Sequence, residues 1–258
     1  MNEAIELACT ETGNGPAVVL LHGLLGNGRN LAPMARVLAD EYRVLTPDLR
    51  NHGQSPHTET MDYPELAADL IALLDKNRID RAALAGHSLG GKIVMTTALL
   101  YPDRVTKLVS LDMAPVPYAQ TLGDLLETLQ RLPLDTIRNR KDADEWLRCE
   151  GVEEKRLRGF LLQNLVRDKD GYCWRVNLET LRSQRQTMTG FPDTAEPWPG
   201  PALFLYGENS DYVLPEHHAE IRRLFPAAEI EEVPNTGHWL HAERPQPIAD
   251  RLKKFLAG

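Results

Sequence analysis

The sequence predicts an α/β fold with a mostly parallel central sheet flanked by helices. Short apolar runs alternate with stretches of helical periodicity, as they do in consecutive βα units. The run Ala17–Leu21 is wholly apolar, which is typical of a strand that helices cover on both faces. A chain of 258 residues can bury enough apolar surface to fold without a disulfide or a metal.

The first elements along the chain follow from residue type and spacing. Ile5–Thr10 is expected to be an edge strand that precedes the buried strand at Ala17. In Leu31–Asp40 the apolar residues recur at positions 31, 34, 35, 37 and 38, which is a helical period. Arg43–Thr46 is expected to be the next strand. Asp62, with a proline two positions later, marks the start of a long helix.

The next three elements surround a glycine-rich turn. The small apolar residues Ala82–Ala85 predict a strand that runs into Gly86. Leu89–Leu100 then predicts a helix that ends near Pro102, because proline removes a backbone donor. Val105–Leu111 is rich in apolar and β-branched residues and predicts another strand.

The pattern changes between residues 113 and 200. No clear buried strand is visible there, and leucines recur at helical spacing, for example Leu122, Leu125, Leu126 and Leu129. After the proline-rich stretch 197–201 the βα alternation resumes, with Ala202–Tyr206, Pro215–Phe225, Glu229–Val233 and Glu243–Leu256. We therefore predict a core formed by residues 1–112 and 201–258, and a helical cap formed by residues 113–200.

Charge and composition exclude several kinds of partner. Lys and Arg number 29 against 37 Asp and Glu, a formal charge of −8, whereas nucleic acids and anionic membranes require clustered cations. The N-terminal residues lack the basic and apolar regions of a signal peptide, and the three cysteines have no C-x-x-C spacing. We therefore expect a cytoplasmic monomer or homodimer that binds no nucleic acid and does not insert into a membrane.

A candidate nucleophile lies between a predicted strand and a predicted helix. Residues Gly86–Gly90 read Gly-His-Ser-Leu-Gly, the G-x-S-x-G elbow, whose sharp turn exposes Ser88 at a helix N-terminus. Gly86–Lys92 also matches the phosphate-binding loop G-x-x-x-x-G-K, but Ile93 lacks the hydroxyl that binds Mg²⁺ there. The sequence therefore favours nucleophilic serine catalysis, which needs no cofactor and no metal.

Acyl transfer also needs two amide donors for the oxyanion that forms. The amide of Leu89 directly follows the candidate nucleophile and is the first expected donor. The turn His22–Gly26 follows the first buried strand, and the amide of Leu24 within it is the second.

The candidate base is His238. It lies between the last predicted strand and the last predicted helix, at the sheet edge expected for Ser88, and it comes last in the chain order serine, acid, histidine. His241 lies three residues further on and suggests a metal pair, but no third ligand follows at a suitable spacing.

Two carboxylates compete for the role of the acid. Asp112 ends the strand Val105–Leu111, and Asp211 follows the strand Ala202–Tyr206, four residues after Gly207. Either one could orient an imidazole and stabilise its protonated form. Spacing alone leaves both candidates open.

Four motifs resemble those of the α/β-hydrolase superfamily, and more narrowly those of the YbfF-type esterases: Arg50–Gly53, Gly86–Lys92, Leu111–Val116 and Gly237–Glu243. The resemblance extends over the whole chain and implies an α/β-hydrolase fold with a helical cap. It also implies a serine esterase for short- to medium-chain carboxylic esters that uses Ser88, Asp112 and His238, because the acid of that branch matches Asp112. Acyl-CoA thioester hydrolysis and carbon–carbon bond hydrolysis are alternatives on the same triad, and a non-catalytic binding module is the alternative outside the class.

Specificity is expected to come from the cap. Five large apolar residues are candidates for lining an acyl pocket: Trp146, Phe160, Trp174, Met188 and Phe191. Four cap arginines are candidates for binding an anionic leaving group such as coenzyme A: Arg156, Arg158, Arg167 and Arg175.

Overall fold

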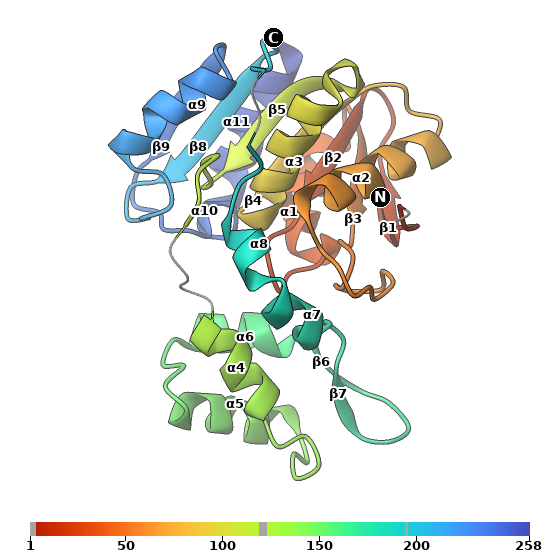
Figure 1. Ribbon diagram of the computed structural model, residues 1–258, viewed down its shortest axis with the longest axis vertical. Coiled ribbons are helices and arrows are strands. Elements are labelled where there is room, and N and C mark those ends of the chain that lie inside the picture. Colours follow the sequence, from red (N-terminus) through yellow and green to blue (C-terminus); the bar gives the residue numbers. More distant parts are fainter. Residues whose placement is uncertain (1–3, 119–122, 194–195) are drawn as a thin grey trace.

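The computed structural model describes residues 4–118, 123–193 and 196–258. A seven-stranded sheet in the order β1-β3-β2-β4-β5-β8-β9 forms its upper lobe (Figure 1). β1 runs antiparallel to β3, and the other neighbours are parallel. The mostly parallel sheet predicted from the sequence is therefore confirmed. Its strands are β1 (Cys9–Thr12), β2 (Ala17–Leu21), β3 (Arg43–Pro47), β4 (Ala82–His87), β5 (Val105–Leu111), β8 (Ala202–Gly207) and β9 (Ala228–Val233).

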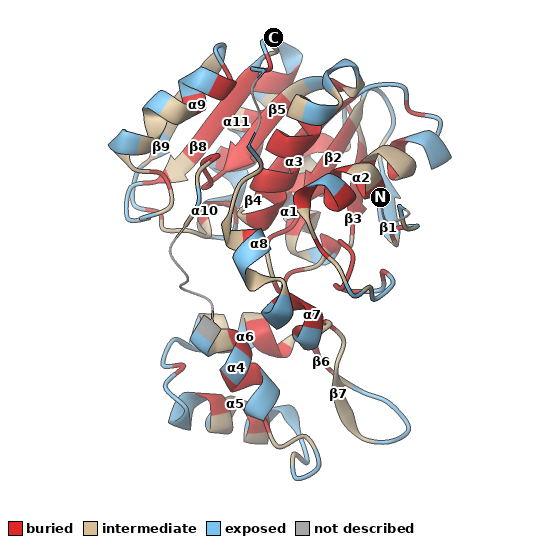
Figure 2. Cartoon of the chain, viewed as in Figure 1, coloured by how far each residue is buried: buried red, intermediate tan, exposed pale blue. Residues whose placement is uncertain are grey.

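Helices cover both faces of the sheet, and the buried residues concentrate on the strands and on the helix faces against them (Figure 2). Val18 and Leu20 of β2 pack with one helix layer, and Val19 and Leu21 pack with the other, since side chains alternate along a strand. The first layer contains α1 (Ala32–Leu38) and α11 (Pro245–Ala257). The second layer contains α2 (Tyr63–Lys76), α3 (Leu89–Leu100) and α9 (His218–Leu224).

Several element boundaries differ from the sequence prediction. The edge strand β1 begins at Cys9 and not at Ile5, because side chains take the earlier amides: Ile5 N donates to Asp69 (2.8 Å) and Ala8 N to Ser55 (2.9 Å). The last helix, predicted over Glu243–Leu256, begins at Pro245 as α11, and a separate short helix, α10 (Leu240–Glu243), precedes it. Two others begin as 3₁₀ turns, at Gly28–Leu31 before α1 and at Pro215–His217 before α9.

Residues 123–183 of the segment assigned to the cap form a lower lobe at the sheet edge where the parallel strands end (Figure 1). Residues 196–200 of the segment lie against the upper lobe, where Trp198 N donates to the carbonyl of Leu224 (2.8 Å). Leu126 and Leu129 of the lower lobe are buried in the same core as α3, while Leu122 lies outside the described residues. The boundaries at 113 and 200 stay predictions. The helices are α4 (Gly123–Arg131), α5 (Arg140–Cys149), α6 (Lys155–Leu162), α7 (Leu178–Ser183) and α8 (Arg185–Thr189).

The same segment contains a hairpin that the sequence analysis missed. β6 (Leu165–Arg167) pairs antiparallel with β7 (Tyr172–Trp174). The carboxylate of Asp168 accepts the N–H groups of Asp170 (2.8 Å) and Gly171 (3.1 Å) and so closes the turn. Strands of three residues are too short to give a recognisable alternation in the sequence.

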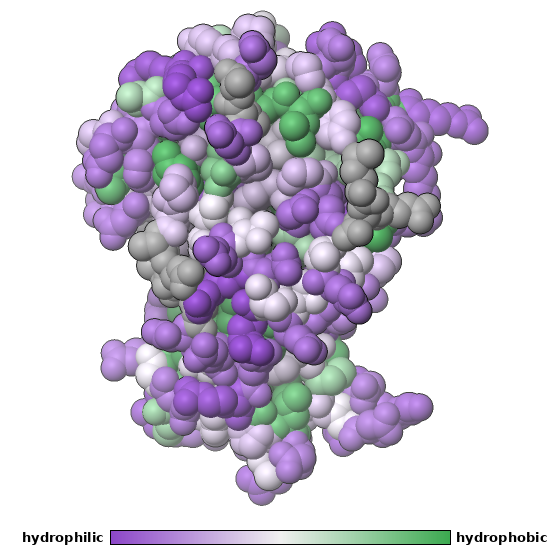
Figure 3. Space-filling model, viewed as in Figure 1, coloured by the Kyte–Doolittle hydropathy of each residue, from purple (hydrophilic) through white to green (hydrophobic). Residues whose placement is uncertain are grey.

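The surface of the face shown in Figure 3 is largely hydrophilic, and hydrophobic side chains gather there only in small separate areas. This agrees with the excess of acidic residues in the composition.

A buried ion-pair cluster joins the loop after β3 to helix α2. Arg50 is 1% exposed and bonds both oxygens of Asp69 (2.7 and 2.8 Å) and one oxygen of Glu65 (2.8 Å). Glu65 is the third residue of α2, whose predicted start is confirmed by a capping box with Asp62. The cluster therefore fixes the loop that follows β3 against the second helix layer.

Replacement of Arg50 by methionine is expected to lower the free energy of unfolding by about 3–5 kcal/mol, because it leaves two buried carboxylates without their cation. Urea unfolding at pH 7 measures the effect. The matched control is Arg223→Met, which removes an exposed pair with Glu220 and should leave the urea midpoint unchanged. Equal midpoints for wild type and Arg50→Met would show that the cluster does not stabilise the fold.

Candidate active site

The candidate nucleophile lies on a strained turn between β4 and α3. Ser88 has φ 52° and ψ −118°, a conformation that L-residues rarely adopt. The turn is tight because the chain passes close to itself: a Cβ added to Gly86 would lie 2.1 Å from the carbonyl oxygen of Gly90. α3 begins at Leu89 directly after this turn, so its N-terminal amides face the serine. This is the strand–turn–helix context predicted for the elbow.

The structure brings Asp112, at the end of β5, against His238. Asp112 is fully buried, and its Oδ2 lies 2.7 Å from Nδ1 of the imidazole. Its two oxygens also accept hydrogen bonds from the amide of Gly207 (2.9 Å) and from the hydroxyl of Ser210. The amide of Gly207 and the hydroxyl of Ser210 thus hold the carboxylate in the orientation that faces His238. The side chain of the other candidate, Asp211, is exposed.

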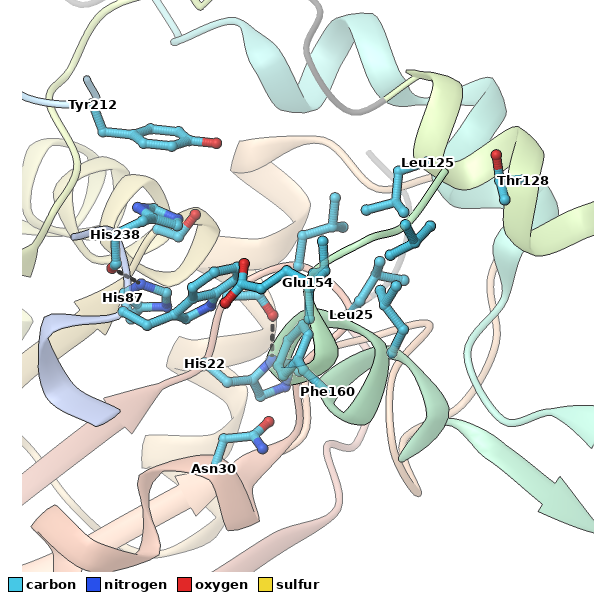
Figure 4. Close-up of a pocket in the computed structure, with 18 of the residues that line it drawn as sticks. His22, Leu25, Asn30, His87, Leu125, Thr128, Glu154, Phe160, Tyr212 and His238 are labelled. Atoms are coloured by element: carbon cyan, nitrogen blue, oxygen red, sulfur yellow. Dashed lines mark hydrogen bonds between the residues drawn. The ribbon is translucent and has the colours of Figure 1, made fainter. Parts of the chain in front are cut away.

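His238 is held from three sides (Figure 4). Its Nδ1 bonds Asp112, and the ring of Tyr212 stacks on the imidazole at 3.9 Å between centroids and 18° between planes. The backbone carbonyl of His238 accepts a hydrogen bond from Nε2 of His87 (2.8 Å), whose ring packs against His241 (4.2 Å). With Nδ1 facing a carboxylate, the neutral imidazole carries its proton there and presents the Nε2 lone pair.

The two predicted oxyanion donors lie beside the candidate nucleophile. Leu89 is the first residue of α3, so its N–H has no partner within the helix. The turn after β2 passes close to the serine, since a Cβ added to Gly23 would lie 3.1 Å from Cβ of Ser88. Leu24, Ser88 and Leu89 line one small cavity together.

Two buried histidines brace the turn that carries Leu24. Nε2 of His22 accepts the N–H of Leu49 (3.0 Å), and Nε2 of His52 accepts the N–H of Leu25 (3.1 Å). Each Nδ1 bonds a backbone carbonyl, that of Gly23 (2.8 Å) for His22 and that of Arg50 (2.9 Å) for His52. The loops after β2 and β3 therefore hold each other through neutral imidazoles. A role for His52 could not be predicted from the sequence, although its His-Gly pair repeats the pair at His22.

Burial disfavours the charged form of these imidazoles. It lowers the pKa of His22 to about 4, and burial together with the neighbouring His22 lowers that of His52 to about 3. Burial also lowers the pKa of His241 to about 4 and that of His87 well below its usual value. All four side chains are neutral when the fold is intact near pH 7.

Stability is therefore expected to fall as the pH drops from about 6.5 to 4. The unfolded chain takes up these protons near pH 6.5 while the native state resists them, so the free energy of unfolding decreases by up to about 1.4 kcal/mol per pH unit for each histidine. Urea unfolding between pH 7.5 and 4.5 tests this. A flat free energy of unfolding across that interval would contradict the assignment of buried neutral histidines.

The large cavity next to Ser88 lies between the core and the cap (Figure 4). It has a volume of about 620 Å³, within the range of small-molecule sites. His22, His87 and His238 line it from the core side, and Leu125 of α4 and Phe160 of α6 from the cap side. Four carboxylates also line it, and each of these residues is exposed: Asp124, Glu150, Glu153 and Glu154.

The cap residues singled out from the sequence divide between the two cavities and other places. Phe160 lines the large cavity, and Met188 lines the small one. The indole of Trp174 donates to the carbonyl of Leu129 (3.1 Å), and Phe191 packs against Tyr63. Trp146 of α5 is half-buried and lines a separate surface hollow.

The four cap arginines are absent from the lining of both cavities. Arg158 is buried, pairs with Asp144 (2.8 Å) and bonds the carbonyls of Val152 and Glu153. Arg175 lines a different hollow, near β1, and Arg167 lies over the ring of Tyr172. Arg156 is exposed on α6.

Neither the phosphate loop nor the metal pair considered from the sequence has its ligands in place. Nζ of Lys92 donates to the carbonyls of Thr189 (2.8 Å) and Gly190, so this lysine joins α3 to the cap. In the described part of the chain, no three His, Cys, Asp or Glu side chains are grouped as metal ligands. Nor does any helix of the described residues combine the length and the apolar character that a membrane span requires.

The chain is similar in sequence and fold to known proteins. A family model described as the alpha/beta hydrolase fold matches residues 16–245. The chain is 42% identical over 250 residues to a Mus musculus protein named sn-1-specific diacylglycerol lipase ABHD11. The aligned region covers 94% of this chain and 81% of the mouse protein. It is 35% identical over 257 residues to the Escherichia coli protein named esterase YbfF, with 99% and 98% covered.

A solved structure titled marine microorganism esterase superimposes with a TM-score of 0.95 at 32% identity, covering 98% of this chain and 100% of that one. The resemblance to YbfF-type esterases that the motifs indicated is thus confirmed. The chain belongs to the α/β-hydrolase family.

Proposed function

We propose that this protein is a serine carboxylesterase in which Ser88 is the nucleophile, His238 the general base and Asp112 the acid of the triad. The observation that carries the proposal is the hydrogen bond between buried Asp112 and His238 (2.7 Å), together with the cavity that His238 and Ser88 line in common. The relatives named esterase and lipase support an ester as the substrate.

The mechanism follows from these positions. Nε2 of His238 takes the proton of the Ser88 hydroxyl as Oγ attacks the ester carbonyl, and the oxyanion accepts hydrogen bonds from the amides of Leu24 and Leu89. The imidazolium gives its proton to the departing alcohol oxygen, which leaves an acyl group on the serine. Water, deprotonated by His238, attacks this acyl-enzyme and releases the carboxylic acid with Ser88 restored. Asp112 keeps its negative charge throughout and stabilises the imidazolium.

An acyl-CoA thioester is the second candidate substrate, and the cavity disfavours it. The four arginines singled out from the sequence line neither cavity, although Arg185 of α8 lines the small one. The large cavity is lined by Asp124, Glu153 and Glu154, and by Glu150, which pairs with Arg131 (3.1 Å). Coenzyme A carries several phosphate charges, which these carboxylates repel. A neutral ester meets no such barrier, so neutral esters fit this cavity better than thioesters of coenzyme A.

The expected result is that p-nitrophenyl butyrate is hydrolysed with a kcat/KM at least about 10-fold above that of butyryl-CoA at low ionic strength, since like charges oppose association. Added salt should narrow the gap, and so should the double substitution Glu153→Gln and Glu154→Gln. The matched control is the neutral ester, whose rate should not respond to either change. A preference for butyryl-CoA in the wild type would contradict the proposal. Hydrolysis of carbon–carbon bonds without ester hydrolysis would point to the other reaction on the same triad.

A cytoplasmic location, and a monomeric or homodimeric state, belong to the same proposal. Cys9, Cys149 and Cys173 are free, as a reducing compartment would keep them. Cell fractionation and light scattering after size-exclusion chromatography test these two statements.

A further inference from the structure

The candidate nucleophile lies where two unequal cavities meet. Leu24, Ser88 and Tyr212 line both the large cavity and the small one. The large cavity has a volume of about 620 Å³ and the small one about 50 Å³. An ester bound at Ser88 has two arms, the acyl chain and the alcohol, and each arm needs its own space.

The direction of proton transfer assigns the two arms. The alcohol oxygen must receive its proton from Nε2 of His238, and His238 lines the large cavity but is absent from the lining of the small one. The oxyanion donor Leu89 lines the small cavity and is absent from the lining of the large one. A carbonyl with its oxygen between the amides of Leu24 and Leu89 therefore directs the alcohol toward the large cavity and the acyl chain toward the small one.

On this basis we propose, as an extension of the esterase function above, that the small cavity is the acyl subsite and that the substrates are esters of short-chain carboxylic acids with large uncharged alcohols. A volume of 50 Å³ accommodates on the order of three to five water-sized groups. The acyl chain therefore extends from acetyl to about hexanoyl. The large cavity leaves room for an alcohol many times that size.

The walls of the small cavity are fixed by hydrogen bonds between core and cap. Met188 of α8 forms part of the wall, and its carbonyl accepts a hydrogen bond from the hydroxyl of Tyr63. Lys92 lines the cavity from α3 and donates to the carbonyls of Thr189 and Gly190, the two residues that follow Met188. Its ammonium also lies 4.7 Å from the ring centre of Tyr118, another wall residue. The wall is anchored at Met188 and at the two residues that follow it, so it limits chain length instead of yielding to longer chains.

The test is a two-way panel of esters. One series varies the acyl chain of a p-nitrophenyl ester from acetyl to decanoyl. The other series keeps a butyryl group and increases the size of the alcohol from ethyl to naphthyl and beyond. Wild-type kcat/KM should peak near butyryl and fall at least about 10-fold by octanoyl, because an apolar pocket discriminates by this much per misplaced methylene. The alcohol series should show no such decline.

Two matched substitutions separate the cavities. Met188→Ala enlarges the small cavity and should move the acyl-length decline by two or more carbons while the alcohol series stays unchanged. Leu157→Ala enlarges the large cavity in the same way, and the chain length at which the acyl series declines should stay the same. Leu126→Val, on α4 in the small cavity, is a milder substitution that gives the same answer if Met188→Ala fails to fold.

The outcomes distinguish this inference from the esterase proposal beneath it. A wild type that hydrolyses no ester overturns the esterase function itself. A wild type that prefers octanoyl or decanoyl esters, with a profile that responds to Leu157→Ala and not to Met188→Ala, overturns the acyl assignment and leaves the esterase function intact.

Discussion

The variant Ser88→Ala is expected to hydrolyse p-nitrophenyl butyrate about 10⁴- to 10⁶-fold more slowly than the wild type, because removal of the nucleophile leaves only binding and oxyanion stabilisation. The loss should fall on kcat. The urea midpoint should stay close to that of the wild type, since alanine at this position occupies the same strained turn as serine.

Ser183→Ala is the matched control, because this hydroxyl lies on α7 and donates to the backbone carbonyl of Thr180 (3.1 Å). It should retain the wild-type rate. A Ser88→Ala variant with even a tenth of the wild-type kcat would exclude an acyl-enzyme at this residue and direct the search to another nucleophile.

The variant Asp112→Asn is expected to lower kcat by about 10⁴-fold while the fold persists. Asparagine is nearly isosteric, but its amide group would donate toward Nδ1 of His238, so the imidazole would carry its proton on Nε2 and could not accept one from Ser88. Rates at several pH values should recover partly above neutral pH, where hydroxide can replace the base.

The same substitution at the other candidate acid is the control. Asp211→Asn changes an exposed side chain one residue after Ser210, and its rate should lie within a factor of two or so of the wild type, as expected for an exposed surface substitution. The reverse result, with a large loss in Asp211→Asn and a small one in Asp112→Asn, would assign the triad acid to Asp211.

The elements around the candidate nucleophile could be predicted because their signals are local. The limits of β2, α3 and β5 match the predicted ranges, since buried apolar runs, glycines and proline define them within a few residues. The strand–turn–helix context of Ser88 follows from the same short stretch. Ser88 and His238 each follow a predicted parallel strand. The carboxyl ends of parallel strands meet at one edge of the sheet, so both residues were expected there.

The choice between Asp112 and Asp211 could not be made from spacing. Both residues follow parallel strands that are direct neighbours, β5 and β8, so both arrive at the same edge. The two carboxylates differ in their long-range hydrogen bonds. Asp112 accepts from the amide of Gly207 and the hydroxyl of Ser210, which lie more than 90 residues later in the chain. A resemblance to a family supplied the preference that the spacing lacked.

The sequence also did not indicate the contacts that support the site from a distance. Tyr212 stacks on His238, Lys92 joins α3 to the cap, and His52 bonds the amide of Leu25, and each of these contacts spans 26 or more residues. None has a characteristic pattern, because the partners meet only after the loops and the cap have packed. The partition into a large and a small cavity depends on the same long-range packing.

The most direct test of the account is covalent labelling of the nucleophile. Wild-type protein is treated with diethyl p-nitrophenyl phosphate, and the adduct is located by mass spectrometry of peptides while residual esterase activity is followed. We expect one diethylphosphoryl group, on Ser88, whose formation parallels the loss of activity, and no adduct in Ser88→Ala. Full esterase activity in a protein labelled on Ser88, or inactivation that follows an adduct on a different residue, would contradict it.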